Sequence, residues 1–124
     1  MKVESPRLGL MKEYRIMMND EPGALADHCE AIAAADVNIL AVVAVGGDTA
    51  SAAILTDNPD ATSGALDGMG ASYTVAELKS AKLDHEPGAL ASFTRGMASS
   101  GVNLKSLYIM SIEGGSATVG YTTD

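Results

Sequence analysis

The sequence Glu21-Pro22-Gly23-Ala24-Leu25-Ala26 occurs a second time as Glu86-Pro87-Gly88-Ala89-Leu90-Ala91, at an offset of 86 − 21 = 65 residues. A second block has the same offset, since Val37-Asn38-Ile39 matches Val102-Asn103-Leu104. Separate blocks in one register without gaps indicate an internal duplication. The rest of the chain is therefore interpreted as two copies of one unit.

Each Pro-Gly pair is typical of the start of a helix, because proline is tolerated in the first turn, where its missing amide hydrogen would be unpaired anyway. We expect the first helix to span residues 22–35 and to end at Asp36, and the second to end at Gly101, which suits a left-handed cap. Spacings of three and four predict the inner faces of the two helices: Leu25, Cys29, Ile32 and Ala33 in the first copy, and Leu90, Phe93, Thr94, Met97 and Ala98 in the second.

Short apolar runs around these helices predict strands. In the first copy they cover residues 14–18, 38–45 and 50–55, with a glycine-rich hairpin at Gly46-Gly47. The run Ile39–Val45 is apolar throughout and predicts a buried strand, and Met17, Met18 and Met69 are interpreted as core residues. Asn58-Pro59 opens a second helix, and a strand from Ser72 runs on into the second copy, whose later strands cover 104–112 and 116–121.

The predicted order is β-α-β-β-α-β followed by β-α-β-β, which indicates an α+β fold of antiparallel sheets with helices on one face. The second copy stops at Asp124, so its second helix and last strand are missing. Three explanations stay open. Residues 1–11 cover the exposed sheet edge, a neighbouring subunit covers it, or the chain is truncated.

This layout, in tandem, resembles a pair of ACT domains, the small amino-acid-sensing modules attached to many metabolic enzymes. The resemblance covers about residues 14–121 and implies ferredoxin-like βαββαβ modules, a complete one at 11–76 and a shorter one at 77–124. It also implies that modules pair side by side and that a small ligand, usually an amino acid, binds in the interface between them.

The physics of the Pro-Gly loops agrees with such a site, because a helix N-terminus presents unpaired amides and partial positive charge to a carboxylate. Glycine allows close approach of a ligand to the backbone. In the family, an Asn two residues before the proline often contacts the ligand, and Asp20 and His85 hold these positions here. The candidate ligand-binding residues are Asp20, Gly23, Ala24, Leu25, Asn38, His85, Gly88, Ala89, Leu90 and Asn103.

Each of these residues has a structural alternative. The Pro-Gly pairs can simply start helices, Asn38 and Asn103 can bridge the turn from helix to strand, and His85 can be an exposed turn residue. Asp84-His85-Glu86 offers the one candidate for proton transfer, but the first copy has Asn19-Asp20-Glu21 there. No nucleophile stands beside a base and no zinc or calcium spacing is present, so we expect no catalytic residue, no metal and no cofactor.

The composition disfavours some classes of binding partner. The 124 residues carry a formal charge of −8, which disfavours nucleic acid and anionic membranes. The lone Cys29 fits a reducing cytoplasm, and residues 1–10 lack the apolar run of a signal peptide. We therefore predict a cytoplasmic homo-oligomer, in the simplest case a dimer, that binds a small amino acid and regulates a metabolic enzyme. The alternative is a structural module for dimerisation or enzyme docking that needs no ligand.

Overall fold

The computed structural model describes residues 11–124, which form two compact units that divide between Glu77 and Leu78. The first unit has the element order βαββαβ and the second has the order βαββ, as the repeat predicted. The first unit contains β1 Lys12–Met18, α1 Ala24–Ala34, β2 Ile39–Val45, β3 Ala50–Thr56, α2 Pro59–Gly68 and β4 Ser72–Glu77. The second contains β5 Lys79–Asp84, α3 Ala89–Ser99, β6 Leu104–Glu113 and β7 Ser116–Thr123.

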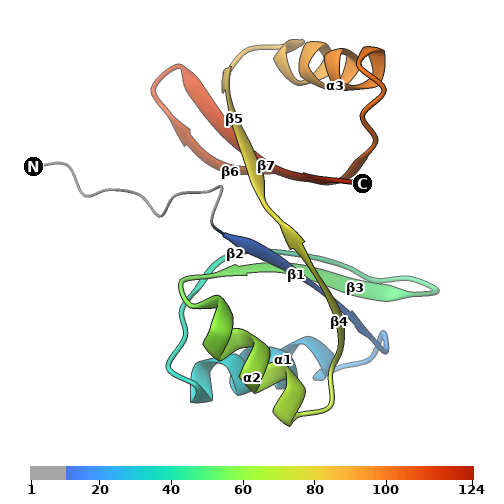
Figure 1. The fold of residues 1–124 in the computed structure, drawn as a ribbon, viewed down its shortest axis with the longest axis vertical. Coiled ribbons are helices and arrows are strands. Elements are labelled where there is room, and N and C mark those ends of the chain that lie inside the picture. The colour runs from blue at the N-terminus through green and yellow to red at the C-terminus, as the bar shows by residue number, and fades with distance from the viewer. Residues whose placement is uncertain (1–10) are drawn as a thin grey trace, which may run out of the picture. The chain divides into compact units, whose positions relative to one another are not determined.

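The sheet of the first unit has the strand order β2-β3-β1-β4, and every neighbouring pair is antiparallel. Its register sets Met18 opposite Ala50 and Glu13 opposite Leu55, so the end of β1 lies beside the β2–β3 hairpin. Helices α1 and α2 lie together on one face of this sheet (Figure 1). The predicted ferredoxin-like α+β fold is therefore confirmed.

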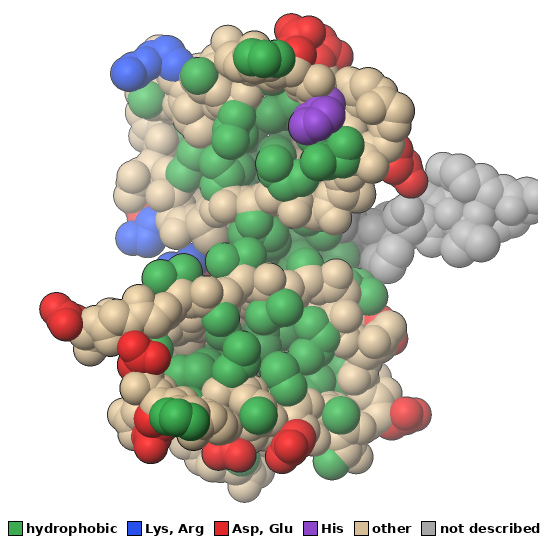
Figure 2. Space-filling model, turned by 180° about the vertical axis from the view of Figure 1, so that it is seen from behind, with side chains coloured by type: hydrophobic (Ala, Val, Ile, Leu, Met, Phe, Trp, Pro, Cys, Tyr) green, Lys and Arg blue, Asp and Glu red, His purple; other side chains and the backbone are tan. Residues whose placement is uncertain are grey.

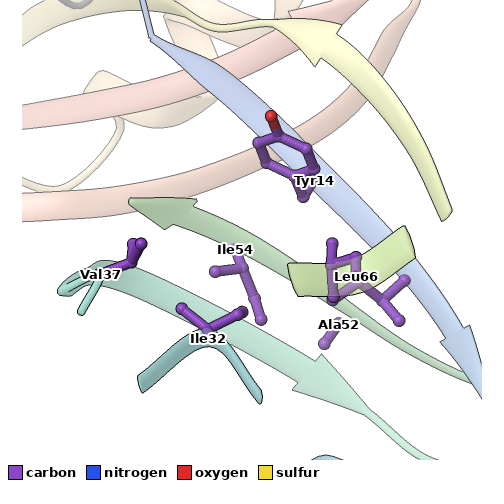
Figure 3. Packing of buried hydrophobic residues seen from close by; sticks show 7 residues of the cluster. Tyr14, Ile32, Val37, Ala52, Ile54 and Leu66 are labelled. Carbon is purple, nitrogen blue, oxygen red and sulfur yellow. The ribbon is translucent and has the colours of Figure 1, made fainter. Parts of the chain in front are cut away.

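The core of the first unit lies between this sheet and the two helices. Ile32 of α1 and Leu66 of α2 are fully buried and converge on Ala52 and Ile54 of β3 (Figure 3). The hydroxyl of Tyr14 in β1 donates to the backbone oxygen of Pro59 at 2.6 Å and lies 2.8 Å from Ser63 Oγ, which ties the sheet to α2.

The second unit repeats the first three strands and the first helix. Its sheet has the order β5-β7-β6, equivalent to β1-β3-β2, and its described residues include no counterpart of α2 or β4. No residue of α3 is buried. The helix contacts its sheet through Phe93, whose ring lies edge-on to Tyr121 with 5.4 Å between the ring centroids. One helix over three strands thus leaves this unit with a more open core.

The predicted helix ends are confirmed at the C-terminal side. Asp36 has φ 62° and Gly101 has φ 77°, and each follows its helix in the left-handed conformation. The next residues, Val37 and Val102, donate their amides back to Ile32 and Met97 at 3.3 and 2.9 Å. Helix α2 begins as predicted, because the side chain of Asn58 accepts the Ala61 amide at 3.1 Å.

Several burial predictions were wrong. Strand β2 is an edge strand with one hydrogen-bonded neighbour, and Leu40, Val42, Val43 and Val45 are 40–62% exposed. A continuous apolar run therefore marked an exposed edge here, and not a central strand. Ala33 and Ala98 are exposed too, as are Leu90, Met17 and Met69. In α1 the inner face instead includes His28, which is 9% exposed.

Two predictions concern residues outside the described part of the chain. The absence of a signal peptide, and the covering of the second sheet's edge by the N-terminal segment, both rest on residues 1–10. Among residues 11–124, no helix is long and apolar enough to cross a membrane.

Candidate ligand-binding site

The two Pro-Gly loops, residues 19–23 between β1 and α1 and residues 85–88 between β5 and α3, have the same backbone geometry. Gly23 has φ 90° and ψ −14°, and Gly88 has φ 92° and ψ −14°. A side chain is disfavoured there by the positive φ alone, because a Cβ added at either glycine would meet no atom within 4 Å. The space beside both glycines is therefore open.

The backbone hydrogen bonds of the loops also match. Ala24 donates to the oxygen of Glu21 and Ala89 to that of Glu86, both at 3.2 Å, which makes these two predicted amides unavailable to a ligand. The amides of Asp27 and Ser92 close the first helical turns on Gly23 and Gly88 at 2.9 Å.

Each helix start has two further backbone amides that donate to no group of residues 11–124. They belong to Leu25 and Ala26 in the first unit, and to Leu90 and Ala91 in the second. Neither helix has a side-chain cap. Each loop therefore ends in a pair of unpaired donors, which suits one carboxylate.

The two residues that precede the prolines by two positions differ in their contacts. Asp20 accepts the amide of Gly47 through Oδ2 at 2.9 Å, so its carboxylate fastens the first loop to the β2–β3 hairpin. A Cβ at Gly46 would lie 3.0 Å from Asp20 Oδ1, so a side chain there would push this carboxylate back by a few tenths of an ångström. His85 is exposed, and its backbone amide, rather than its ring, donates to the oxygen of Gly115 at 2.8 Å.

The first loop borders a hollow of about 180 Å³ on its hairpin side. Its walls include Asp20 and Glu21 of the loop, Leu25 of α1, and Val45 and Gly46 at the end of β2. The loop and the edge strand thus border one space.

Asn38 and Asn103 lie at the opposite end of their own sheets. Ile39, which follows Asn38, pairs with Thr56, whereas the Pro-Gly loop follows the end of β1 that pairs with Ala50. The backbone of Asn38 bonds Asp57 in both directions at 3.1 Å, and Asn103 donates its side-chain amide to Asp124 at 3.2 Å. Neither unit brings its asparagine to its own loop, and both residues bridge to the neighbouring strand.

No known family profile matches the sequence, and no curated protein is significantly similar to it in sequence. Solved structures do match. Protein BT0572 from Bacteroides thetaiotaomicron has a TM-score of 0.75 at 19% identity, over 94% of this chain and 81% of that one. The regulatory subunit of aspartate kinase from Thermus thermophilus has a TM-score of 0.68 at 14% identity, over 90% and 82%. The same subunit from Thermus flavus has a TM-score of 0.68 at 16% identity, over 91% and 81%.

This chain has the tandem ACT fold. The resemblance drawn from the Pro-Gly loops is confirmed at the level of the fold, and the identities are too low to carry more than that. Within residues 11–124, no group of three His, Cys, Asp or Glu side chains could hold a metal ion. The His85 ring makes no hydrogen bond to Asp84 or Glu86, so these three residues do not form a hydrogen-bonded chain.

Two features of these loops were not predicted from the sequence. The amides of Ala26 and Ala91 are unpaired because the turn in each loop uses the amide of the preceding Ala24 or Ala89 instead. The hexapeptide repeat alone does not reveal this turn. The contact of Asp20 with Gly47 joins residues 27 positions apart, and no local pattern predicts it.

Proposed function

We propose that this protein is a regulatory amino-acid-binding protein without catalysis of its own. The observation that supports it is the shared geometry of the two Pro-Gly loops, each of which ends in a pair of unpaired amides above an open glycine. In this proposal the amides of Leu25 and Leu90, with those of Ala26 and Ala91, hold the ligand carboxylate. Gly23 and Gly88 leave room for it.

The two loops are expected to bind a zwitterion unequally. The Asp20 carboxylate lies beside the first loop and favours the ammonium group of an amino acid, whereas the exposed His85 stands beside the second. Asn38 and Asn103 can serve such a ligand only from a different module, because each lies at the far end of its own sheet.

Pairing with a second copy is the second element of the proposal. Strand β2 leaves one edge unpaired within its sheet, and its side chains Leu40, Val42, Val43 and Val45 are exposed. Figure 2 shows apolar side chains gathered on the surface of the first unit, with acidic side chains set apart around them. An exposed apolar edge strand is a template for pairing with another chain. A homodimer would bring two modules side by side at a ligand.

The proposed role is allosteric. A ligand that contacts two modules stabilises one relative arrangement of them, which a partner enzyme can sense. Two structures with this fold are named as regulatory subunits of aspartate kinase, which favours an enzyme of amino-acid metabolism as the partner.

Calorimetric titration of the full chain with each proteinogenic amino acid tests this function. We expect heat of binding and thermal stabilisation for a small subset, and loss of both in Gly23→Val together with Gly88→Val. Gly101→Val is the matched control, because it has φ 77° at the far end of α3 and is strained in the same way. Uniform absence of heat, or equal loss in the control, contradicts the proposal.

The exposed β2 edge also supports a second function, ligand-independent assembly or docking. Native mass measurement with and without the amino acids separates the two. An oligomer whose mass and stability do not change with any amino acid, and which tolerates valine at Gly23 and Gly88, supports ligand-independent assembly. Val45→Lys, which adds charge to the edge, is expected to dissociate the oligomer under either function.

A further inference from the structure

A second hollow, of about 430 Å³, lies in the first unit beside the α2–β4 turn. Its walls are the end of β1, the first Pro-Gly loop, the first turn of α1 and residues 69–72 of the turn. Of these two hollows, Asp20, Leu25 and Gly46 line only the smaller one described above, whereas Met18, Asn19, Glu21 and Ala24 border both. The volume lies in the range of small-molecule sites.

His28 is the most informative side chain in this hollow, because it is 9% exposed and has one nitrogen committed. Nδ1 lies 2.7 Å from the backbone oxygen of Ala24. A carbonyl only accepts hydrogen bonds, so Nδ1 carries the proton, and in the neutral imidazole Nε2 is then a bare acceptor. Nε2 has no partner among residues 11–124. No unpartnered nitrogen or oxygen is sealed from solvent there, so Nε2 remains accessible.

The charged residues of the wall are also hydrogen-bond acceptors, like His28 Nε2. Glu21 and Asp27 line the hollow, and neither carboxylate forms an ion pair or side-chain hydrogen bond within residues 11–124. No Lys or Arg lines it, and the apolar part of the wall is supplied mainly by Met17, Met18 and Met69. Thioether side chains are flexible and adapt to alkyl groups of different shape.

Three acceptors, two of them anionic, beside an apolar wall are complementary to a cation that carries several N–H donors on an alkyl chain. We propose that this hollow binds the ammonium or guanidinium group of a small aliphatic ligand, with His28 Nε2, Asp27 and Glu21 as acceptors and the methionines against its chain. This site differs in chemistry from the proposed amino-acid site, which takes a carboxylate through backbone amides, although Glu21 borders both hollows.

The second unit offers a natural comparison, because it lacks this chemistry in the same register. Ser92 stands where the first unit has Asp27, and Phe93 stands where it has His28. The turn that forms the far wall has no counterpart among the described residues of the second unit. We therefore expect one cation site for each chain.

The test uses the full chain, labelled with ¹⁵N, and two probes of equal length. We expect n-pentylamine to shift the His28 Nε2 resonance and the amides of Gly70, Ala71 and Ser72 saturably. Uncharged n-pentanol should give no saturable shift at the same concentrations. Absence of a saturable shift with n-pentylamine, or equal affinity for the two probes, overturns the proposal.

Two variants carry residues from the second unit into the first. His28→Phe and Asp27→Ser should each weaken n-pentylamine binding about tenfold, since each removes one acceptor of a charged donor. Glu30→Gln changes a charge on the same helix outside the hollow and should leave binding unchanged. Unchanged affinity in Asp27→Ser, whose exposed site does not endanger folding, overturns the assignment even where His28→Phe is unstable.

Two sets of variants distinguish amine binding in this hollow from amino-acid binding at the Pro-Gly loops. Gly23→Val together with Gly88→Val should abolish amino-acid heat while n-pentylamine still shifts residues 70–72. Loss of amine binding in Asp27→Ser without loss of amino-acid binding shows the reverse.

Discussion

The two units share one helix-start geometry but differ in how their cores are closed. Helix α1 buries Ile32 and His28 against the sheet and α2, whereas α3 buries no residue. The Pro-Gly loops nevertheless agree within 2° in φ at their glycines, 90° against 92°. The difference teaches that the loop is encoded locally by the repeated hexapeptide, while a closed core depends on the segment 58–77, which has no second copy among residues 11–124.

Truncating equivalent residues of α1 and α3 has the largest expected effect. Ile32 is fully buried, and Ile32→Ala should lower the free energy of unfolding of the first unit by about 3 kcal/mol, through lost burial and the cavity left behind. Met97 occupies the same register in α3 but is half-buried, so Met97→Ala should cost the second unit about 1 kcal/mol.

Urea unfolding followed by hydrogen exchange of amides in each unit measures both losses. Equal losses would contradict the comparison, because they would mean that another chain closes the core over α3 in solution.

Loss of the Tyr14 hydroxyl, which joins the sheet to α2, should have the next largest effect on stability. Tyr14→Phe removes the hydroxyl that donates to Pro59 and contacts Ser63, and should cost about 1–2 kcal/mol. Lys79 has the same register in β5 and donates from an exposed position to Thr123. Lys79→Ala should therefore change stability by less than about 0.5 kcal/mol. Thermal unfolding of both variants checks this, and a neutral Tyr14→Phe would show that the hydroxyl contacts do not hold α2.

The order of elements could be predicted from the sequence because its signals are local. Asp36 and Gly101 end their helices through their own backbone conformation, and Asn58 begins α2 through its side chain, as predicted. The start of the first helix was predicted two residues early, because α1 begins at Ala24 with Gly23 as its N-cap and Pro22 lies before the helix. The internal repeat was enough to predict the order of elements in the second unit. What the pattern predicts well is therefore where each element begins and ends.

Burial could not be predicted in the same way, because it depends on neighbours in space. Strand β2 is as apolar as a central strand, but its place at the sheet edge exposes Val45 at 62%. The site shows the same limit. Gly23 and Gly88 were identified from the motif, whereas the commitment of Ala24 to Glu21 and of Asp20 to Gly47 required the fold.

The smallest effect is expected at Tyr73, which joins β4 to α2 in a segment without a counterpart among the described residues of the second unit. Its hydroxyl donates to Asp67 Oδ1 at 2.7 Å, and this hydrogen bond to a carboxylate raises the pKa of Tyr73 above its ordinary value near 10, because it stabilises the protonated phenol. Since the raised pKa belongs to the folded state, the contribution is complete below the pKa of the unfolded chain and is lost as pH rises through the folded value. Alkaline titration of phenolate absorbance, with Tyr73→Phe to assign the signal, should show the pKa of Tyr73 falling in Asp67→Asn. An unchanged pKa in that variant would mean that the Asp67 contact is not maintained in solution, and that β4 is held to the first unit by its pairing with β1 and the packing of Tyr73 against Tyr14.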